Sequence, residues 1–183
     1  MKTKKGFKII LYSISIILLL ILIIIGYLYY NYRTRSGVDT EKYPYTVEYI
    51  APDKALLNKD FNVCDENFLV QYYNSQRARY SKGKNGLRNF IISHYKNKNY
   101  TDSGYLNIRF IINCKGEAGR YVIHENSLNL EPKEFNKDLV NQLFNLTTQL
   151  KKWNPNYTYE AFRDSYMYLS YRIENGEITE ILP

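Results

Sequence analysis

The most regular hydrophobic pattern in the chain is an uninterrupted apolar run near its beginning. From Ile9 to Tyr30 there are 22 residues without a charge, and most of them are Ile or Leu. At 1.5 Å per helical residue the run measures about 33 Å, enough to cross a hydrocarbon core of about 30 Å. It therefore predicts a transmembrane helix over residues 9–30, marked along its length by Ile9, Ile16, Leu20, Ile24 and Tyr30.

The run also resembles a cleaved signal peptide, but such a peptide has a shorter apolar core and a small-residue cleavage site. The stretch Ile24–Leu28 offers no such site, and no Cys directly follows the run as a point of lipid attachment. Four Lys precede the run and two Arg follow it, at positions 33 and 35. The missing cleavage site predicts an uncleaved anchor, and the positive-inside rule predicts a cytoplasmic basic tail over residues 1–8 and export of residues 31–183.

No clear period follows the run until about residue 60. Residues 31–60 contain Gly37, Pro44 and Pro52 amid mixed charges. We interpret them as a tether with at most a short strand near Tyr45–Ile50, followed by one domain over residues 61–183. The first part of that domain, Phe61–Tyr73, fits a buried strand and a short helix equally well.

Two later segments show the 3.6-residue period of amphipathic helices. The first is Gly86–Lys98, where one face carries Leu87, Phe90, Ile91, His94 and Tyr95. The second runs from Phe135 to Trp153 and ends before Pro155, with Leu139, Leu143, Leu146 and Leu150 spaced by three or four residues.

Alternating patterns predict four strands. They are Leu106–Cys114, Gly119–Ile123, a third within Tyr159–Ile173, and Ile178–Leu182, with turns at Lys115–Gly116 and Asn175–Gly176. The order is helix, strand, strand, helix, strand, strand, and only antiparallel pairs allow such short turns. The expected fold is therefore α+β, a small antiparallel sheet with two helices packed on one face.

The charge changes the range of expected partners. The formal net charge of +7 suggests nucleic acid at first sight, but residues 1–35 carry six basic residues and no acid. The remaining 148 residues hold 19 basic and 18 acidic side chains. Because the domain itself is almost neutral, we expect no nucleic-acid partner. The 45% apolar content excludes a disordered chain.

Motifs for catalysis are missing from the sequence. The two His residues have no metal-ligand spacing between them or to either Cys, and there is no nucleophile elbow or phosphate-binding glycine loop. The carboxylates are scattered. The sequence therefore predicts no catalytic residue, no metal, no cofactor and no small-molecule substrate, and an envelope enzyme of unknown class stays an alternative.

The two cysteines are expected to form a disulfide. An exported domain lies where disulfides persist, and Cys114 lies on the predicted core face of its strand. A Cys64–Cys114 bond would close a loop of about 50 residues and stabilise the domain by about 4 kcal/mol. The alternative is two separate buried thiols, which pack as small apolar groups.

Several motifs, in order, resemble TonB-like C-terminal domains. The run Tyr80–Leu87 (Tyr-Ser-Lys-Gly-Lys-Asn-Gly-Leu) is similar to the Phe-Pro-Gly-Gly-x-x-Ala-Leu motif that opens these domains. Gly104–Ile112 with Gly116 resembles their Gly-x-Val-x-Val-x-Phe-x-Val…Gly hairpin, and Trp153-Asn154-Pro155 stands where they have Trp-x-Pro. The third strand and the end at Ile181-Leu182-Pro183 also fit, so the resemblance covers about residues 78–183.

The resemblance implies an inner-membrane anchor, a periplasmic domain and a Gram-negative envelope. It favours a membrane-tethered, non-enzymatic binding module; the alternative is a TonB-type energy transducer that drives an outer-membrane transporter. The tether has only Pro44 and Pro52, which is not a long proline-rich spacer. The anchor keeps only Ser13 and Ser15 and lacks the polar His that would couple it to a proton-driven motor.

In energy transducers of that family the last strand offers an edge that pairs with a short segment of an outer-membrane transporter. For this chain we expect an outer-membrane or periplasmic protein as the partner. We therefore expect the binding edge at Asp164–Ile173 or at the neighbouring strand Glu177–Leu182. On the third strand the outward positions are Tyr166, Tyr168, Ser170 and Arg172. The alternative is that Tyr is simply a good strand residue and is abundant here.

Overall fold

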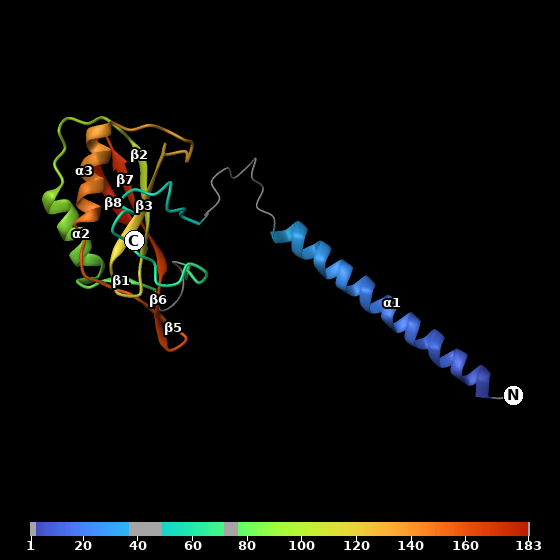
Figure 1. The fold of residues 1–183 in the computed structure, drawn as a ribbon. Coiled ribbons are helices and arrows are strands. Elements are labelled where there is room, and N and C mark those ends of the chain that lie inside the picture. The colour runs from blue at the N-terminus through green and yellow to red at the C-terminus, as the bar shows by residue number, and fades with distance from the viewer. Residues whose placement is uncertain (1–2, 37–48, 72–76, 183) are drawn as a thin grey trace. The chain divides into compact units, whose positions relative to one another are not determined.

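The computed structural model describes residues 3–36, 49–71 and 77–182 of the chain. The chain divides into two units, Met1–Glu48 and Tyr49–Pro183. The first contains the helix α1 (Thr3–Ser36), and the second is an α+β domain (Figure 1). The predicted fold class is confirmed at this level.

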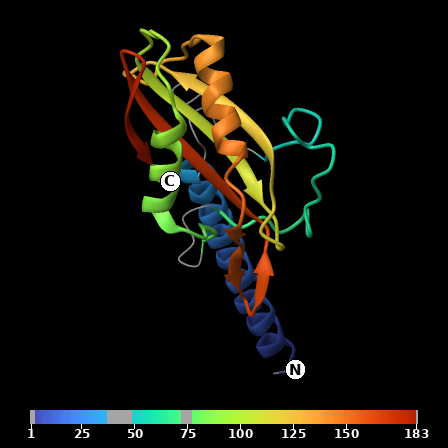
Figure 2. The ribbon, with the colours of Figure 1, turned by 90° about the vertical axis from the view of Figure 1, so that its left-hand side faces the viewer.

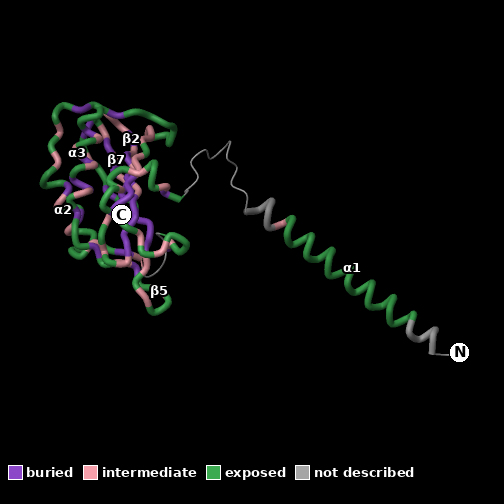
Figure 3. The backbone as a smooth tube through the Cα atoms, in the orientation of Figure 1, coloured by how far each residue is buried: buried purple, intermediate pink, exposed green. Residues whose placement is uncertain are grey.

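Helix α1 is long and apolar enough to cross a membrane. Its segment Lys8–Asn31 has a mean hydropathy of 3.1, and none of its most apolar stretch is buried within the protein (Figure 3). All five residues expected to mark the anchor expose more than half of their surface: Ile9, Ile16, Leu20, Ile24 and Tyr30. The Ser13 hydroxyl donates to the Ile9 carbonyl over 3.0 Å, which satisfies this polar group inside the helix.

Among the described residues the domain contains two helices and eight strands, which include the predicted elements in their predicted order. In chain order they are β1 (Arg79–Tyr80), α2 (Gly83–His94), β2 (Gly104–Ile112), β3 (Ala118–Asn126), α3 (Lys137–Thr148), β4 (Trp153–Asn154), β5 (Asn156–Thr158), β6 (Ala161–Arg163), β7 (Ser165–Glu174) and β8 (Glu177–Leu182). Strands β3-β2-β7-β8, in that order, form one antiparallel sheet, while β1 pairs with β4 and β5 with β6. The short strands β1, β4, β5 and β6 were not predicted.

Both helices pack on one face of this sheet, as expected (Figures 1 and 2). The larger hydrophobic core joins side chains of both helices to alternate residues of the central strands. Its most buried members include Leu87, Ile91, Leu139, Leu143, Leu106, Ile108, Leu169 and Tyr171. The period of 3.6 in the helices and of 2 in the strands directs these side chains to the same layer.

The other face of the sheet is covered by residues 49–71, which we call the N-terminal layer. Ile50 and Phe61 pack there against Ile111 and Tyr166 in a second, smaller core. The expected domain boundary at residue 61 therefore lies inside the folded unit, which begins at Tyr49. The sequence did not predict this packing, because the apolar residues of the segment, such as Ile50 and Phe61, are isolated and follow no helical or strand period. Residues 37–48 of the expected tether lie outside the described residues.

Within the N-terminal layer the backbone is irregular. Leu56 pairs with Tyr121 on the outer edge of β3, and Val70 forms a single parallel bridge with Ser165 of β7. The described part of Phe61–Tyr73 is thus neither the strand nor the helix that its composition allowed. The N-terminal layer is attached to the sheet by these two bridges and by side-chain packing.

A β-bulge in β3 places neighbouring side chains on the two faces of the sheet. The register between β2 and β3 shifts between Arg109 and Ile111, and Arg120 there takes a φ of 50°. This left-handed conformation is uncommon for a residue other than glycine. The bulge directs Tyr121 into the helix-side core and Arg120 into the N-terminal layer, where its contacts hold the conformation.

Candidate binding edge, disulfide site and cationic groove

The expected binding edge on β7 is wrong, because β7 lies inside the sheet. Ser170 faces Asn107 of β2 on one side and Leu182 of β8 on the other. The turn at Asn175 and Gly176 takes φ values of 51° and 76°, which folds β8 directly against β7. The last hairpin thus covers the edge that β7 would otherwise offer.

The four predicted side chains lie on one face, opposite the helices, but in different surroundings. Tyr166 is buried beneath the N-terminal layer, and Arg109 stacks on its ring at 4.2 Å. Tyr168 is exposed, Ser170 donates a hydrogen bond to Asn107, and Arg172 forms ion pairs with Glu174 and Glu180. They form a partly covered sheet surface and do not form an edge.

The second expected position, β8, is an edge. Among the described residues β8 pairs only with β7, whereas the opposite edge strand β3 is bridged by Leu56 and Pro132. A two-residue turn makes Glu174 and Glu177 a hydrogen-bonded pair, so the main-chain N–H and C=O of Ile178 point away from β7. These groups are available to an incoming strand.

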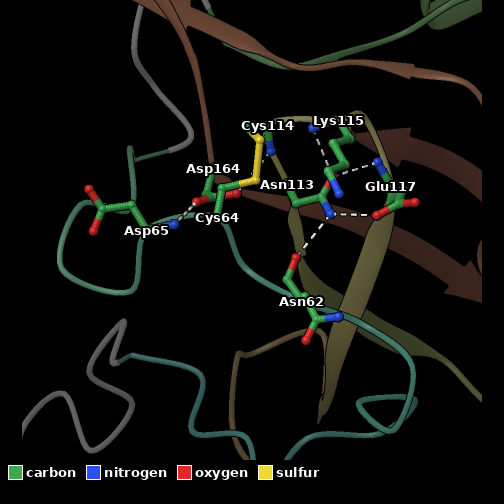
Figure 4. Close-up of a disulfide and its surroundings, with 8 residues drawn as sticks. All are labelled: Asn62, Cys64, Asp65, Asn113, Cys114, Lys115, Glu117 and Asp164. Carbon is green, nitrogen blue, oxygen red and sulfur yellow. Dashed lines mark hydrogen bonds between the residues drawn. A yellow bond between two sulfur atoms is a disulfide. The ribbon is translucent and has the colours of Figure 1, made fainter.

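The predicted Cys64–Cys114 disulfide is present and ties the N-terminal layer to the end of β2 (Figure 4). Beside it the Asp164 carboxylate is 1% exposed and accepts hydrogen bonds from the main-chain N–H of Asp65 at 2.7 Å and of Cys114 at 2.9 Å. Asn113 adds a bond from its amide to the Asn62 carbonyl at 3.0 Å. Three segments of the chain therefore meet around one disulfide: the N-terminal layer, the end of β2 and the residue that precedes β7.

The same site contains the only group of three metal-ligating side chains in the described residues. The ligand atoms of Cys64, Cys114 and Asp164 lie within 4.8 Å of one another. Both sulfurs are bonded to each other, and the carboxylate already accepts two N–H groups. In its disulfide form the group is a structural clasp.

A second clasp, which the sequence did not reveal, is centred on Arg120. Its guanidinium pairs with the Glu66 carboxylate and donates to the Asn58 side chain at 3.0 Å and to the Tyr49 hydroxyl at 3.2 Å. Tyr49 in turn donates to Glu66 at 2.6 Å. The hydrogen bonds from Arg120 lower the pKa of Glu66. The carboxylate is therefore more stable as an anion in the folded state than in the unfolded chain.

The lowered pKa of Glu66 predicts a pH-dependent stability. Its contribution is fully present above the ordinary pKa of 4.5 and is lost as the pH falls through the lower folded value. We expect Glu66→Gln to lower the free energy of unfolding at pH 7 by about 1 kcal/mol, since the carboxylate is half exposed. Chemical unfolding at several pH values measures this. In Glu66→Gln the free energy of unfolding should fall less steeply as the pH drops below about 4.5. The control Glu134→Gln, at an exposed position, should keep the pH dependence of the parent protein.

Two adjacent hollows lie beside β1 and share Arg77 and Arg79. The first measures about 390 Å³ and has Lys84 on its rim and Leu87, Trp153 and Met167 among its walls. The second measures about 340 Å³ and is lined also by Asn154, Pro155 and Tyr157. We call the two together the cationic groove. The sequence does carry a signal for it, because residues 67–101 contain seven Lys and Arg and no Asp or Glu.

Comparison with protein-family models, with curated proteins and with solved structures finds no match to this chain. The resemblance to TonB-like domains therefore stays a prediction that rests on the sequence motifs. What the structure adds is an apolar helix, a disulfide-clasped α+β domain and one sheet edge uncovered by the described residues.

Proposed function

We propose that the protein is a membrane-tethered, non-enzymatic binding module that captures a protein of the cell envelope along β8. The observation that supports it best is the asymmetry of the sheet edges: β3 is bridged by other segments of the chain, and β8 is not bridged by any described residue. An edge strand that offers unpaired main-chain groups is a ready site for strand addition.

The proposal places α1 in the inner membrane and the domain in the periplasm. The helix of membrane-spanning length, the excess of Lys before it and the disulfide of the domain all agree with this arrangement. Protease added to intact cells should leave the domain whole and should digest it once the outer membrane is opened. Recovery of a soluble protein that begins near residue 28 would contradict the anchor.

Strand addition at β8 predicts that capture depends on one main-chain donor. A photo-crosslinker at Thr179, exposed on β8, should trap an envelope protein in cells, and Ile178→Pro should abolish trapping because it removes the outward N–H. Ile178→Ala is the matched control, since it loses the side chain and keeps the N–H. A crosslinker at Asn129, exposed between β3 and α3, should trap little.

Equal trapping by the Pro and Ala variants, with both folded, would rule out strand addition at β8. The identity of the trapped protein separates the two functional hypotheses. An outer-membrane transporter would support an energy transducer, whereas another envelope protein would support a binding module alone.

A further inference from the structure

The charge of the domain is strongly segregated although its total is nearly zero. The acid-free stretch 67–101 carries seven cations: Arg77, Arg79, Lys82, Lys84, Arg88, Lys96 and Lys98. Of these, Lys98 pairs with Asp138 at 2.9 Å. No described carboxylate lies within ion-pair distance of Arg79, Lys82 or Lys84, which surround the start of α2. The positive charge of this surface is therefore not neutralised by the described residues of the domain.

The cationic groove combines this charge with an apolar floor. In the first hollow Leu87, Trp153 and Met167 are each at most 5% exposed and form rigid walls of the core. Arg79 and Lys84 stand at its rim with exposed side chains. Such a hollow suits an apolar group that has negative charge beside it, because the apolar group contacts the apolar walls and the negative charge pairs with the cations at the rim.

The two hollows are neighbours at the short sheet of β1 and β4. The pairing of these strands sets Arg79 opposite Asn154 and Tyr80 opposite Trp153. Arg77 and Arg79 line both the hollow that contains Trp153 in its wall and the one that contains Tyr157. An extended chain can reach two adjacent hollows, whereas a lipid headgroup would use only the cations.

The start of α2 also favours a negatively charged ligand. Its N-cap residue, Lys82, makes no side-chain capping bond, and its first turn contains no acidic residue. The positive end of the helix dipole thus lies beside Lys82 and Lys84, an arrangement that favours an anion from outside the domain.

We propose that the cationic groove binds an extended acidic peptide segment of the partner. One apolar side chain of the segment enters the hollow above Leu87 and Met167, and flanking carboxylates pair with Arg79 and Lys84. The inference rests on the proposed function, because it names the chemistry of the protein that the module captures.

The single tryptophan of the chain, Trp153, lines the groove and reports binding directly. The full-length protein in phosphatidylcholine nanodiscs is titrated with a dansyl-labelled peptide of alternating Glu and Leu, and energy transfer from tryptophan to dansyl is followed. We expect a saturable signal that weakens with salt, since exposed charges are screened. A peptide of alternating Lys and Leu should give none.

Charge reversal in the groove, Arg79→Glu with Lys84→Glu, should weaken binding at least about tenfold, which corresponds to about 1.4 kcal/mol. The matched control, Lys59→Glu with Lys115→Glu, makes the same change of net charge at two exposed positions outside the groove. It should alter affinity by less than about twofold. Both double variants are first compared with the parent protein by thermal unfolding, so that a loss of binding is read only from folded protein.

Three results would overturn the inference. They are equal affinity of the two double variants, equal binding of the Lys peptide, and displacement of the probe by short-chain phosphatidylglycerol at lower concentration than by unlabelled peptide. The last result would assign the groove to lipid headgroups. Failure of the peptide titration while trapping at β8 still requires the Ile178 N–H would reject this inference and leave the proposed function standing.

Discussion

Loss of the Cys64–Cys114 disulfide is expected to lower the free energy of unfolding of the domain by about 4 kcal/mol. The bond joins residues 50 positions apart, and a loop of that length restricts the unfolded chain strongly. Because folded domains are stable by only about 5–15 kcal/mol, the loss is a large fraction of the total. Denaturant unfolding of the full-length protein, oxidised and reduced, measures it through the fluorescence of Trp153.

The double variant Cys64→Ala with Cys114→Ala provides the control for this experiment. It should unfold like the reduced parent protein and should not respond to reductant. Coincident unfolding curves for oxidised and reduced parent protein would contradict the prediction. A reduced domain that stays folded should also show faster proteolysis within residues 49–71, because Asp164 and Asn113 would then be the main remaining ties at this site.

Replacement of Gly119 by a residue with a side chain is expected to have the second largest effect on the stability of the domain. A Cβ added at this position would overlap Cγ and lie only 2.6 Å from Cβ of Phe61, which packs on the sheet in the smaller core. We expect Gly119→Ala to destabilise the domain by about 2–3 kcal/mol, since overpacking forces side chains and backbone to shift. Phe61 belongs to the N-terminal layer, which the sheet holds by few main-chain bridges, so the strain should be relieved by partial release of this layer.

A double-mutant cycle tests this mechanism specifically. In the Phe61→Gly background the same Gly119→Ala substitution should cost less than about 0.5 kcal/mol, because both the ring and the Cβ of Phe61, the atoms nearest to the added Cβ, are gone. The cycle is measured by chemical unfolding of the four proteins. Equal costs in both backgrounds would place the strain elsewhere than in the contact with Phe61.

These two predictions concern the segment through which the chain enters the domain. Residues 49–71, which include the second part of the expected tether, are held by the disulfide, by Arg120 and by Phe61. If α1 is fixed in a membrane, as we propose, any pull on the tether reaches the sheet through these ties first. The edge strand β8, at the end of the chain, is separate from this path.

The local elements could be read from the sequence because their causes are local. Helices α2 and α3 carry an apolar face with a 3.6-residue period, and β2 alternates from Leu106 to Ile112. The Asn175–Gly176 turn requires two residues that tolerate positive φ, and both occur there. The membrane-length helix followed from composition alone, and the disulfide from the expected compartment and the position of Cys114.

Only the tertiary structure decided which residues meet across the sheet. The position of β7 between β2 and β8 depends on pairs such as Asn107 with Ser170, 63 residues apart, and no local pattern encodes that choice. The N-terminal layer is held by Ile50, Phe61 and the bulge at Arg120, each an isolated residue without a period. Likewise, the cationic groove joins Arg79 to Trp153 and Met167, which come from three separate strands. Periodicity reports which face of an element is apolar, but the free energy of long-range packing selects the neighbour against which that face is buried.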